Sequence, residues 1–163
     1  MQKLRDVTLL FLVKKEDNKI TDICLAMKKR GFGTGRWNGV GGKLHENETI
    51  EEAARRETKE EIGVEPHGLQ QVAELSFFTL HKPEWNQKAH VFFCDSWTGS
   101  LTESEEMRPA WYSVTDIPYQ SMWPDDTHWL PKVLGGNYVV ASFTFGEGDV
   151  ILKKDVETTS LVR

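Results

Sequence analysis

Residues 42–64 read GKLHENETIEEAARRETKEEIGV, and this stretch carries the strongest structural signal in the chain. Thr49 followed by Glu52 three positions later is a capping box, which marks the start of a helix. Gly63 supplies the stop expected just beyond a helix end. The pattern therefore predicts a helix over 49–62. At 100° per residue its core-facing arc contains Ile50, Ala53, Ala54, Thr58 and Ile62.

Two glutamates lie inside this apolar arc, and a third lies at its border. Glu57 and Glu61 are the two inside, and Glu60 is the one at the border. Neighbours at these spacings repel one another, and burial of carboxylates without partners is costly. Either the arc is shifted and the helix is a solvated, charged element, or a cation binds to this face. Carboxylate oxygens favour Mg²⁺ or Mn²⁺. Arg56 can reach Glu60 and Glu52 from one turn away, which makes it an orienting residue.

The segment before the helix, residues 30–42, is dense in glycine. Six of its thirteen residues are glycine, which lets backbone groups approach a ligand closely. Phe32 and Trp37 argue against a purely flexible linker, since linkers rarely carry large aromatic residues. The Gly41 carbonyl could complete a metal site beside the helix. A metal ion held by glutamates can clamp a diphosphate and activate water, so the residues alone indicate metal-dependent phosphoryl chemistry.

The rest of the chain alternates predicted strands and short helices, which favours one α/β or α+β domain over 1–163. The core is expected over about 5–155, with a polar, frayed tail over 157–163. Strands are predicted at 7–13, 20–27, 69–80, 89–97, 111–114, 138–145 and 150–152, and helices at 117–122 and 125–134.

Composition excludes several classes of protein. A chain of 163 residues with 39% hydrophobic and 28% charged residues is neither disordered nor collagen-like. The net charge of −5 argues against a nucleic-acid polymer as ligand. Residues 42–64 hold seven glutamates against four basic residues, so much of this charge lies at the predicted cation site. Cys24 and Cys94 lie in apolar runs and read as buried thiols. With no membrane span or signal segment predicted, we expect a cytoplasmic protein.

Residues 42–64 resemble the signature of the Nudix family. Eight of nine specified positions match: Gly42, Glu48, Arg56, Glu57, Glu60, Glu61, Gly63 and Val64. Thr58 departs, because the family pattern has an aliphatic residue there. Residues 28–39, 105–109 and 123–126 further resemble the animal MutT-homologue branch, the oxidised purine nucleoside triphosphate diphosphatases. The likeness covers about 7–152 and implies an α/β/α sandwich with a mixed central sheet.

The resemblance also implies an activity and a metal site. The activity is hydrolysis of 8-oxo-dGTP, and of 2-hydroxy-dATP or methylated purine nucleotides, to the monophosphate and pyrophosphate, which cleans the nucleotide pool. Glu57, Glu61 and the Gly41 carbonyl would bind Mg²⁺, for which Mn²⁺ can substitute. Glu60 would join a further ion, and Glu106 would approach from an opposing loop. Glu61 would help to deprotonate water. We expect a monomer with a nucleotide as its partner.

A second group of residues is predicted to recognise the base. Asn38 offers a donor and an acceptor for a purine edge, or caps a turn beside Gly39. Asp125 and Asp126 either cap a helix or form a pair in which one carboxyl stays protonated. Trp123 offers a stacking face or is an ordinary core residue. Weaker candidates, each as consistent with plain packing or a solvated surface, are Thr8, Lys28, Phe32, Phe77 and Met107.

Other functions remain open from sequence. Thr79 stands where the animal branch would have a second pocket aromatic residue, so the preferred base is not defined. One alternative is a Nudix diphosphatase for a nucleotide sugar, a capped RNA or a methylated purine nucleotide. Another is a non-catalytic nucleotide-binding module. The complete set Glu57, Glu60 and Glu61 counts against the module, since a binder has no need of it.

Overall fold

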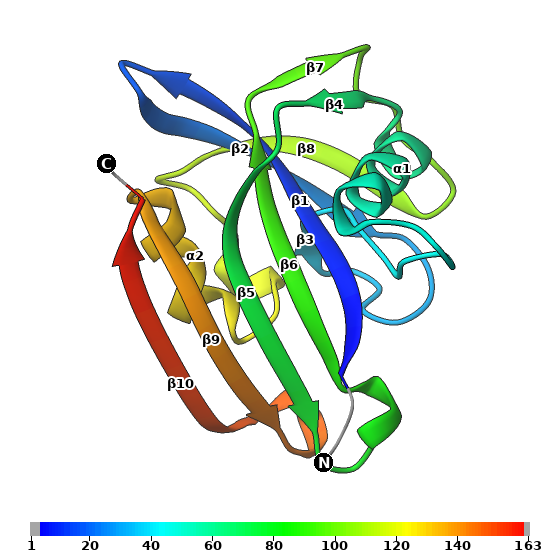
Figure 1. Cartoon of the computed structure of the whole chain (residues 1–163), viewed down its shortest axis with the longest axis vertical. Helices are drawn as coiled ribbons and strands as arrows, with labels where there is room; N and C mark the ends of the chain where they lie inside the picture. Colours follow the sequence, from blue (N-terminus) through cyan, green and yellow to red (C-terminus); the bar gives the residue numbers. More distant parts are fainter. Residues whose placement is uncertain (1–3, 162–163) are drawn as a thin grey trace.

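A mixed β-sheet forms the centre of the computed structural model, which describes residues 4–161 (Figure 1). Its strands follow the order β10-β9-β5-β6-β1-β2-β3, and β8 also pairs with β2. The pairs β1 with β6 and β5 with β9 are parallel, and the other pairs are antiparallel. The strands are β1 (Arg5–Glu16), β2 (Lys19–Lys28), β3 (Trp37–Asn38), β5 (Gln70–Thr79), β6 (Gln87–Cys94), β8 (Met107–Ser113), β9 (Asn137–Phe145) and β10 (Ile151–Ser160).

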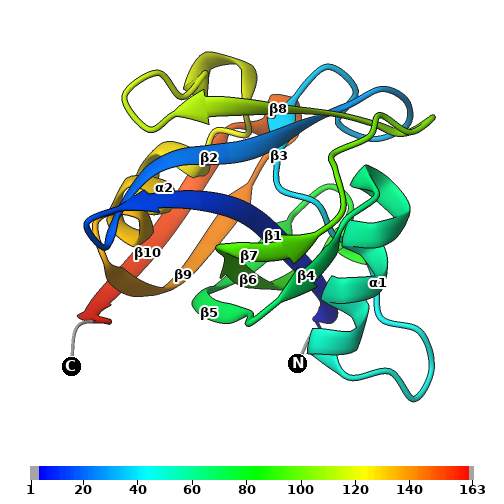
Figure 2. The same ribbon diagram turned by 90° about the horizontal axis from the view of Figure 1, so that it is seen from above.

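The helices α1 (Ile50–Ile62) and α2 (Asp126–Leu134) lie on either side of these strands (Figure 2). Successive side chains of a strand point to opposite faces, so the apolar run of β1 supplies two cores. Phe11 packs in the core that contains Trp129 of α2, whereas Leu10 packs in the core that contains Ala54 of α1. The predicted sandwich with a mixed central sheet is confirmed, because both faces of the sheet are covered.

Helix α1 begins and ends where its sequence predicted. Both hydrogen bonds of the capping box between Thr49 and Glu52 are present. Gly63 ends the helix in the left-handed region at φ 79°, and its N–H donates to the Lys59 carbonyl. Thr58 is fully buried, and its hydroxyl donates to the Ala54 carbonyl at 2.7 Å. This bond satisfies the hydroxyl, which explains how a polar residue is accommodated where the family has an aliphatic one.

The C-terminal prediction was wrong. Residues 151–160, which include most of the predicted short strand and the first part of the predicted tail, form the ten-residue strand β10, which pairs with β9 as far as Ser160. Residues 162–163 of the predicted tail lie outside the described residues. Most of its side chains are exposed because it lies at the edge of the sheet. A polar composition is typical of edge strands, and here it hid the strand from hydrophobic patterning.

Other boundaries also differ from the prediction. The strand expected over 111–114 is β8, which begins earlier, at Met107. The helix expected over 117–122 is only the 3₁₀ turn η2 (Tyr119–Ser121), which follows Pro118. The strand expected over 89–97 is interrupted after Cys94, and β7 (Ser96–Thr98) pairs with β4 (Glu65–His67) in a separate two-stranded sheet. Further 3₁₀ turns are η1 (Pro83–Trp85) and η3 (Glu147–Asp149).

The end of the glycine-rich segment lies directly against β1. Val40 and Leu10 exchange backbone hydrogen bonds at 2.9 and 2.7 Å, and the Thr8 N–H donates to the Gly42 carbonyl at 2.9 Å. A Cβ atom on Gly41 would lie 1.8 Å from the Thr8 carbonyl oxygen, so any side chain there would collide with β1. Glycine at this position therefore allows the segment to pass between β1 and α1.

Both cysteines are buried and unpaired, as their apolar surroundings predicted. Burial raises the pKa of Cys24 to about 12, so its thiol stays protonated. Within residues 4–161, neither α-helix is long and apolar enough to cross a membrane.

Candidate active site

Helix α1 presents three of its glutamates to a cleft across from the loop before β8. We call this the acidic cleft; it is lined by Glu57, Glu60, Glu61, Ser104, Glu105 and Glu106. The structure thus brings Glu106 opposite the helix, where the resemblance had placed it. Glu105 and Ser104 are additional lining residues that the sequence did not single out. The carboxylates converge because Glu57, Glu60 and Glu61 share one face of a helix.

Glu61 is the buried carboxylate of this cleft, with only 6% of its surface exposed. The Gly41 N–H donates to its Oε2 at 3.2 Å. Burial, and then the charge of the neighbouring Glu57, raises the pKa of Glu61 to about 8. The Lys28 charge acts in the opposite direction. A buried carboxylate with one backbone donor is under-compensated as an anion, which favours a cationic partner.

Arg56 fixes the orientation of the cleft's outer carboxylates. Its Nε and Nη2 donate to the two oxygens of Glu48 at 2.8 and 3.0 Å, a bidentate pair. Its Nη1 donates to Glu57 at 2.8 Å and to Glu60 at 3.3 Å. The hydrogen bonds to Arg56 lower the pKa of Glu48 to about 2. The expected contact with Glu52 is wrong, because that side chain bonds back to Thr49 in the capping box.

The donor set of the acidic cleft fits a hard divalent cation. Its carboxylates supply several anionic oxygens within one cleft, which are the ligands that Mg²⁺ prefers. Among residues 4–161, however, no three acidic, histidine or cysteine side chains are gathered closely enough to enclose an ion. The carboxylates line a cleft, which suits an ion that keeps part of its water shell and shares its ligands with a phosphate chain.

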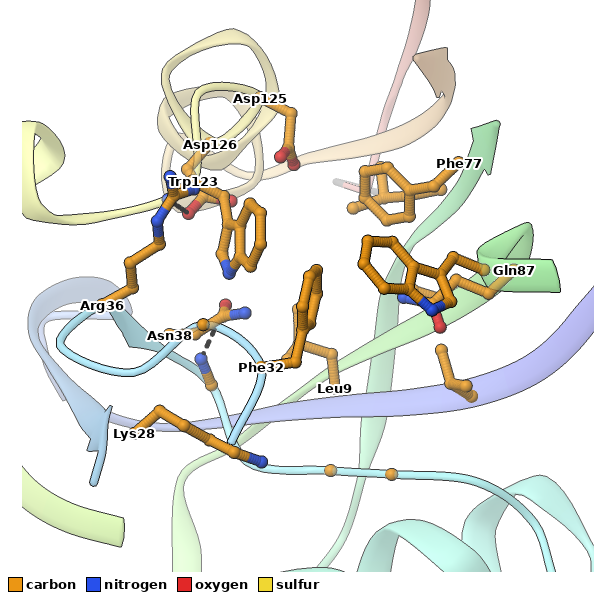
Figure 3. A pocket seen from close by; sticks show the side chains of 18 of the residues that line it. Leu9, Lys28, Phe32, Arg36, Asn38, Phe77, Gln87, Trp123, Asp125 and Asp126 are labelled. Carbon is orange, nitrogen blue, oxygen red and sulfur yellow. Dashed lines mark hydrogen bonds between the residues drawn. The ribbon is translucent and has the colours of Figure 1, made fainter. Parts of the chain in front are cut away.

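A cavity of about 460 Å³ lies beside the acidic cleft and contains every residue that sequence reasoning assigned to the substrate (Figure 3). Asp125 and Asp126 stand at one side, and Phe77 comes from the sheet at another. Those lining residues are Thr8, Lys28, Phe32, Asn38, Phe77, Met107, Trp123, Asp125 and Asp126. Gly41 also lines this cavity, so the glycine segment joins the cavity to Glu61.

Asp125 and Asp126 are adjacent, almost fully buried carboxyl groups. Asp125 accepts a hydrogen bond from the indole N–H of Trp129 at 2.9 Å, and Asp126 accepts one from the Trp123 backbone N–H at 3.2 Å. Burial raises the pKa of Asp125 to about 6. Burial and the charge of Asp125 raise the pKa of Asp126 well above its usual range. Asp125 occupies the N-cap position of α2, but its side chain makes no capping bond.

Asn38 lies on β3 and points its amide group into the cavity (Figure 3). Its Oδ1 accepts a hydrogen bond from the Gly39 N–H at 2.9 Å, which is the turn-capping role considered from sequence. The amide NH₂ is therefore the group that can face a ligand. A donor at this position suits an acceptor atom on a purine edge.

Trp123 is held between two other side chains. The Arg36 guanidinium lies 4.0 Å from the indole centroid, and the Phe32 ring centroid lies 5.1 Å away. Arg36 is in turn bound to Asp149 of η3, with Nη2 donating to Oδ2 at 2.9 Å. Its buried Nη1 has no hydrogen-bond partner within residues 4–161. These contacts fix the plane of Trp123 beside the paired aspartates.

Sequence reasoning missed Arg36 and Trp85, which both line the cavity. Arg36 lies within the glycine-rich segment, but the ring that it contacts belongs to Trp123, which is far away in the sequence. Trp85 lies in the polar turn over 81–87. A large aromatic residue in a glycine-rich or polar turn is the signal that singled out Phe32, and the same signal could have singled out Trp85.

Comparison with known proteins is consistent with this geometry. The NUDIX domain family matches residues 3–133 of the chain. The chain belongs to the Nudix family. Two Nudix relatives are oxidized purine nucleoside triphosphate hydrolases. The mouse (Mus musculus) protein is 46% identical over 80% of this chain and 83% of its own length. The zebrafish (Danio rerio) protein is 41% identical over 83% of this chain and 86% of its own length.

The Nudix fold is also found among solved structures. A mutator MutT protein from Bacillus halodurans superposes with a TM-score of 0.80, covering 94% of this chain and 98% of its own. At 22% identity, this likeness concerns the fold. The family predicted from residues 42–64 is therefore confirmed.

Proposed function

We propose that this Nudix protein hydrolyses oxidised purine nucleoside triphosphates, 8-oxo-dGTP among them, to the monophosphate and pyrophosphate. The observation that carries the proposal is the junction of two unlike sites. A cavity with a buried aspartate pair continues along Gly41 into a cleft lined by carboxylates. The similarity to the mouse and zebrafish hydrolases supports the same substrate class.

The base end of the nucleotide would lie in the cavity. Because burial raises the pKa values of Asp125 and Asp126, the pair can present one donor and one acceptor to a base near neutral pH. The amide NH₂ of Asn38 adds a second donor. Trp123 offers an aromatic ring for contact with the base. Oxidation of a purine changes its pattern of donors and acceptors, and a mixed set of this kind can read that change.

The phosphate end would extend past Lys28 and Gly41 to the acidic cleft. Glu57, Glu60, Glu61 and Glu106 would hold Mg²⁺, or Mn²⁺ in its place. A bound divalent ion neutralises phosphate charge and lowers the pKa of the water that it binds. Lys28 lines the cavity, and its charge acts on Glu61 of the acidic cleft, so its ammonium group can contact a phosphate oxygen.

Hydrolysis consumes one water molecule and breaks the bridge between the α- and β-phosphates. A phosphorus–oxygen bond to the water oxygen forms, and the old bridging oxygen leaves with the other fragment. The water proton needs an acceptor, and we assign this role to Glu61. The assignment is supported by the burial of Glu61 in the cleft and by its hydrogen bond from the Gly41 N–H. Arg56 would keep Glu57 and Glu60 oriented throughout.

A substrate panel tests this proposal. We expect kcat/KM at fixed Mg²⁺ to be higher for 8-oxo-dGTP and 2-hydroxy-dATP than for dGTP, with N6-methyl-dATP included as a methylated purine. Product analysis should give pyrophosphate, since cleavage between the α- and β-phosphates releases it. A flat profile across purines and pyrimidines would exclude the oxidised purine as the preferred substrate. Binding without turnover would instead support a nucleotide-binding module.

A further inference from the structure

Trp85 stands at the mouth of the base cavity and contacts its aromatic wall. Its ring centroid lies 4.7 Å from that of Phe32, and Phe32 in turn lies 5.1 Å from Trp123. The three rings come from separate segments: η1, the glycine-rich segment and the residues before α2. They form a continuous row along one side of the cavity, and all three line it.

The paired strands β5 and β6 form the cavity floor next to the turn that carries Trp85. Leu75 pairs with Ala89, and Phe77 pairs with Gln87, and all four line the cavity. Side chains two residues apart share a face of a strand. Thr79, the last residue of β5, follows Phe77 on that face and also lines the cavity. Trp85 ends the 3₁₀ turn η1 two residues before Gln87, and its side chain lines the same cavity. Thr79 is small and leaves the end of the cavity open, and the indole from the facing segment covers that end.

The loop that carries Trp85 is anchored by hydrogen bonds. The Thr79 N–H donates to Asn86 Oδ1 at 2.7 Å, which ties the end of β5 to the start of β6. Arg5 Nη2 donates to the Glu84 carbonyl at 2.8 Å, which ties the loop to β1. Lys82 Nζ lies 4.3 Å from the Trp85 ring centroid. The indole is therefore positioned by its surroundings and is a fixed wall of the cavity.

Phe32 and Trp85 remain unusually open to solvent for large aromatic residues that contact each other. Phe32 is 61% exposed and Trp85 is 38% exposed. Exposed apolar groups gathered at a cavity mouth are typical of a ligand-binding surface, because a ligand removes them from water. A flat nucleobase is the occupant that aromatic rings of this kind suit best.

We propose that Trp85 is a specificity-determining residue that closes the outer end of the purine pocket, taking the role that Thr79 cannot fill. This rests on the proposed function, because it takes the cavity to be the base site. A two-ring base whose edge reaches Asp125 or Asp126 extends far enough to be covered by Trp85. A one-ring base held at the same aspartates leaves Trp85 without contact, so Trp85 favours purines over pyrimidines.

The test compares Trp85→Ala with Trp85→Phe and two controls. Leu80→Ala changes an exposed side chain of the same loop outside the cavity lining, and Trp97→Phe changes a tryptophan that stacks on Trp111. KM and kcat are measured for 8-oxo-dGTP and dCTP, and binding of 8-oxo-dGMP is measured by calorimetry. Loss of one base–aromatic contact corresponds to about a tenfold change.

We expect Trp85→Ala to raise KM for 8-oxo-dGTP about tenfold with kcat little changed, and to affect dCTP much less. Trp85→Phe should restore most of the difference, and both controls should match the original protein. If the ratio of kcat/KM for 8-oxo-dGTP to that for dCTP is unchanged in Trp85→Ala, the proposed role of Trp85 is overturned, while the proposed function stays intact. An equal loss in Leu80→Ala would also overturn it, because loop geometry would then be responsible.

The calorimetric measurement separates this proposal from the function on which it rests. If the original protein shows no preference for oxidised purine triphosphates, the proposed function fails. About tenfold weaker binding of 8-oxo-dGMP by Trp85→Ala than by the original protein would still support the role of Trp85 in closing the pocket. Equal binding by the two proteins, or no binding by either, would overturn it.

Discussion

The acidic cleft and the pair Asp125 and Asp126 both gather neighbouring carboxyl groups, yet their surroundings differ. In the acidic cleft, Arg56 binds Glu57 and Glu60, and the cleft is open to solvent. The aspartate pair is almost fully buried, and its hydrogen bonds come from the Trp129 indole and the Trp123 backbone. An open cleft with oriented carboxylates suits a cation, whereas burial raises the pKa values of the aspartate pair and favours its neutral form.

The comparison shows how one functional group can serve two kinds of chemistry in the same protein. An opposite charge favours the ionised carboxylate, and burial favours the neutral acid. Glu61 lies between these cases, because it is buried like the aspartates but borders a cleft that a cation can enter. Ionised carboxylates in the acidic cleft suit a metal-bound triphosphate. Neutral carboxyl groups in the cavity suit the edge of a base.

The largest effect should come from the acidic cleft. Glu61→Gln removes the charge of the buried carboxylate and its ability to accept a proton, so we expect kcat to fall by about 10²–10⁴-fold. Steady-state kinetics with 8-oxo-dGTP measure this. Glu51→Gln, at an exposed position in the first turn of the same helix, should keep full activity. Essentially unchanged turnover in Glu61→Gln would remove the catalytic role from this end of the site.

The second test concerns the aspartate pair. Asp125→Ala or Asp126→Ala leaves a polar group of the base unpaired. We therefore expect kcat/KM for 8-oxo-dGTP to fall, by an amount that corresponds to about 1–3 kcal/mol of lost transition-state stabilisation. Parallel assays with dCTP provide the control, and they should change little. An equal loss for the pyrimidine would indicate a folding defect and no role in base recognition.

The third test asks whether the order of the acidic cleft depends on its arginine. Arg56→Lys keeps the charge but cannot make the bidentate bond to Glu48 while also holding Glu57, so kcat/KM should fall by about 10–100-fold. Arg55→Lys is the matched control, since Arg55 bonds to the Pro66 carbonyl instead. Full activity of Arg56→Lys would show that charge alone is sufficient.

The smallest effect is the pH dependence of stability at the aspartate pair. The pKa values of both carboxyls are raised in the folded state, so the folded protein binds more protons than the unfolded chain. Their contribution to stability therefore decreases as pH rises from about 4 through about 6 and beyond. Asp126→Asn removes one ionisation, and urea denaturation at pH 8 should show it about 1 kcal/mol more stable than the original protein.

That gain should shrink when the same denaturation is repeated at pH 5, where the native carboxyls hold their protons. A gain of equal size at both pH values would attribute the effect to packing. A loss of stability at pH 8 would contradict the raised pKa of Asp126.

Local signals predicted the acidic side of the site well. The capping residues and Gly63 lie within a few positions of the helix that they bound, and the spacing of Glu57 and Glu61 alone places them on one face. The aspartate pair was also visible as adjacent carboxyls beside tryptophans. Its raised pKa values could not be calculated from sequence, because burial depends on α2, β1 and the glycine-rich segment together.

Contacts between distant segments could not be predicted. Nothing near Arg36 in the chain indicates that it stacks on Trp123 and binds Asp149. The contact between Phe32 and Trp85 is likewise made only when the loops meet across the sheet. Most of strand β10 was missed for another reason, because its pairing uses backbone groups that do not depend on apolar side chains.

The parallel pairing of β1 with β6 has a consequence for synthesis of the protein. Thr8 pairs with His90 and Leu12 with Cys94, so the first strand made awaits a partner about eighty residues later in the chain. The hairpin of β1 and β2 can form early, but the other edge of β1 keeps its backbone groups unpaired until β6 leaves the ribosome. Such long-range pairing is slow to form. Both ends of the nucleotide site therefore mature late, because each is assembled against β1.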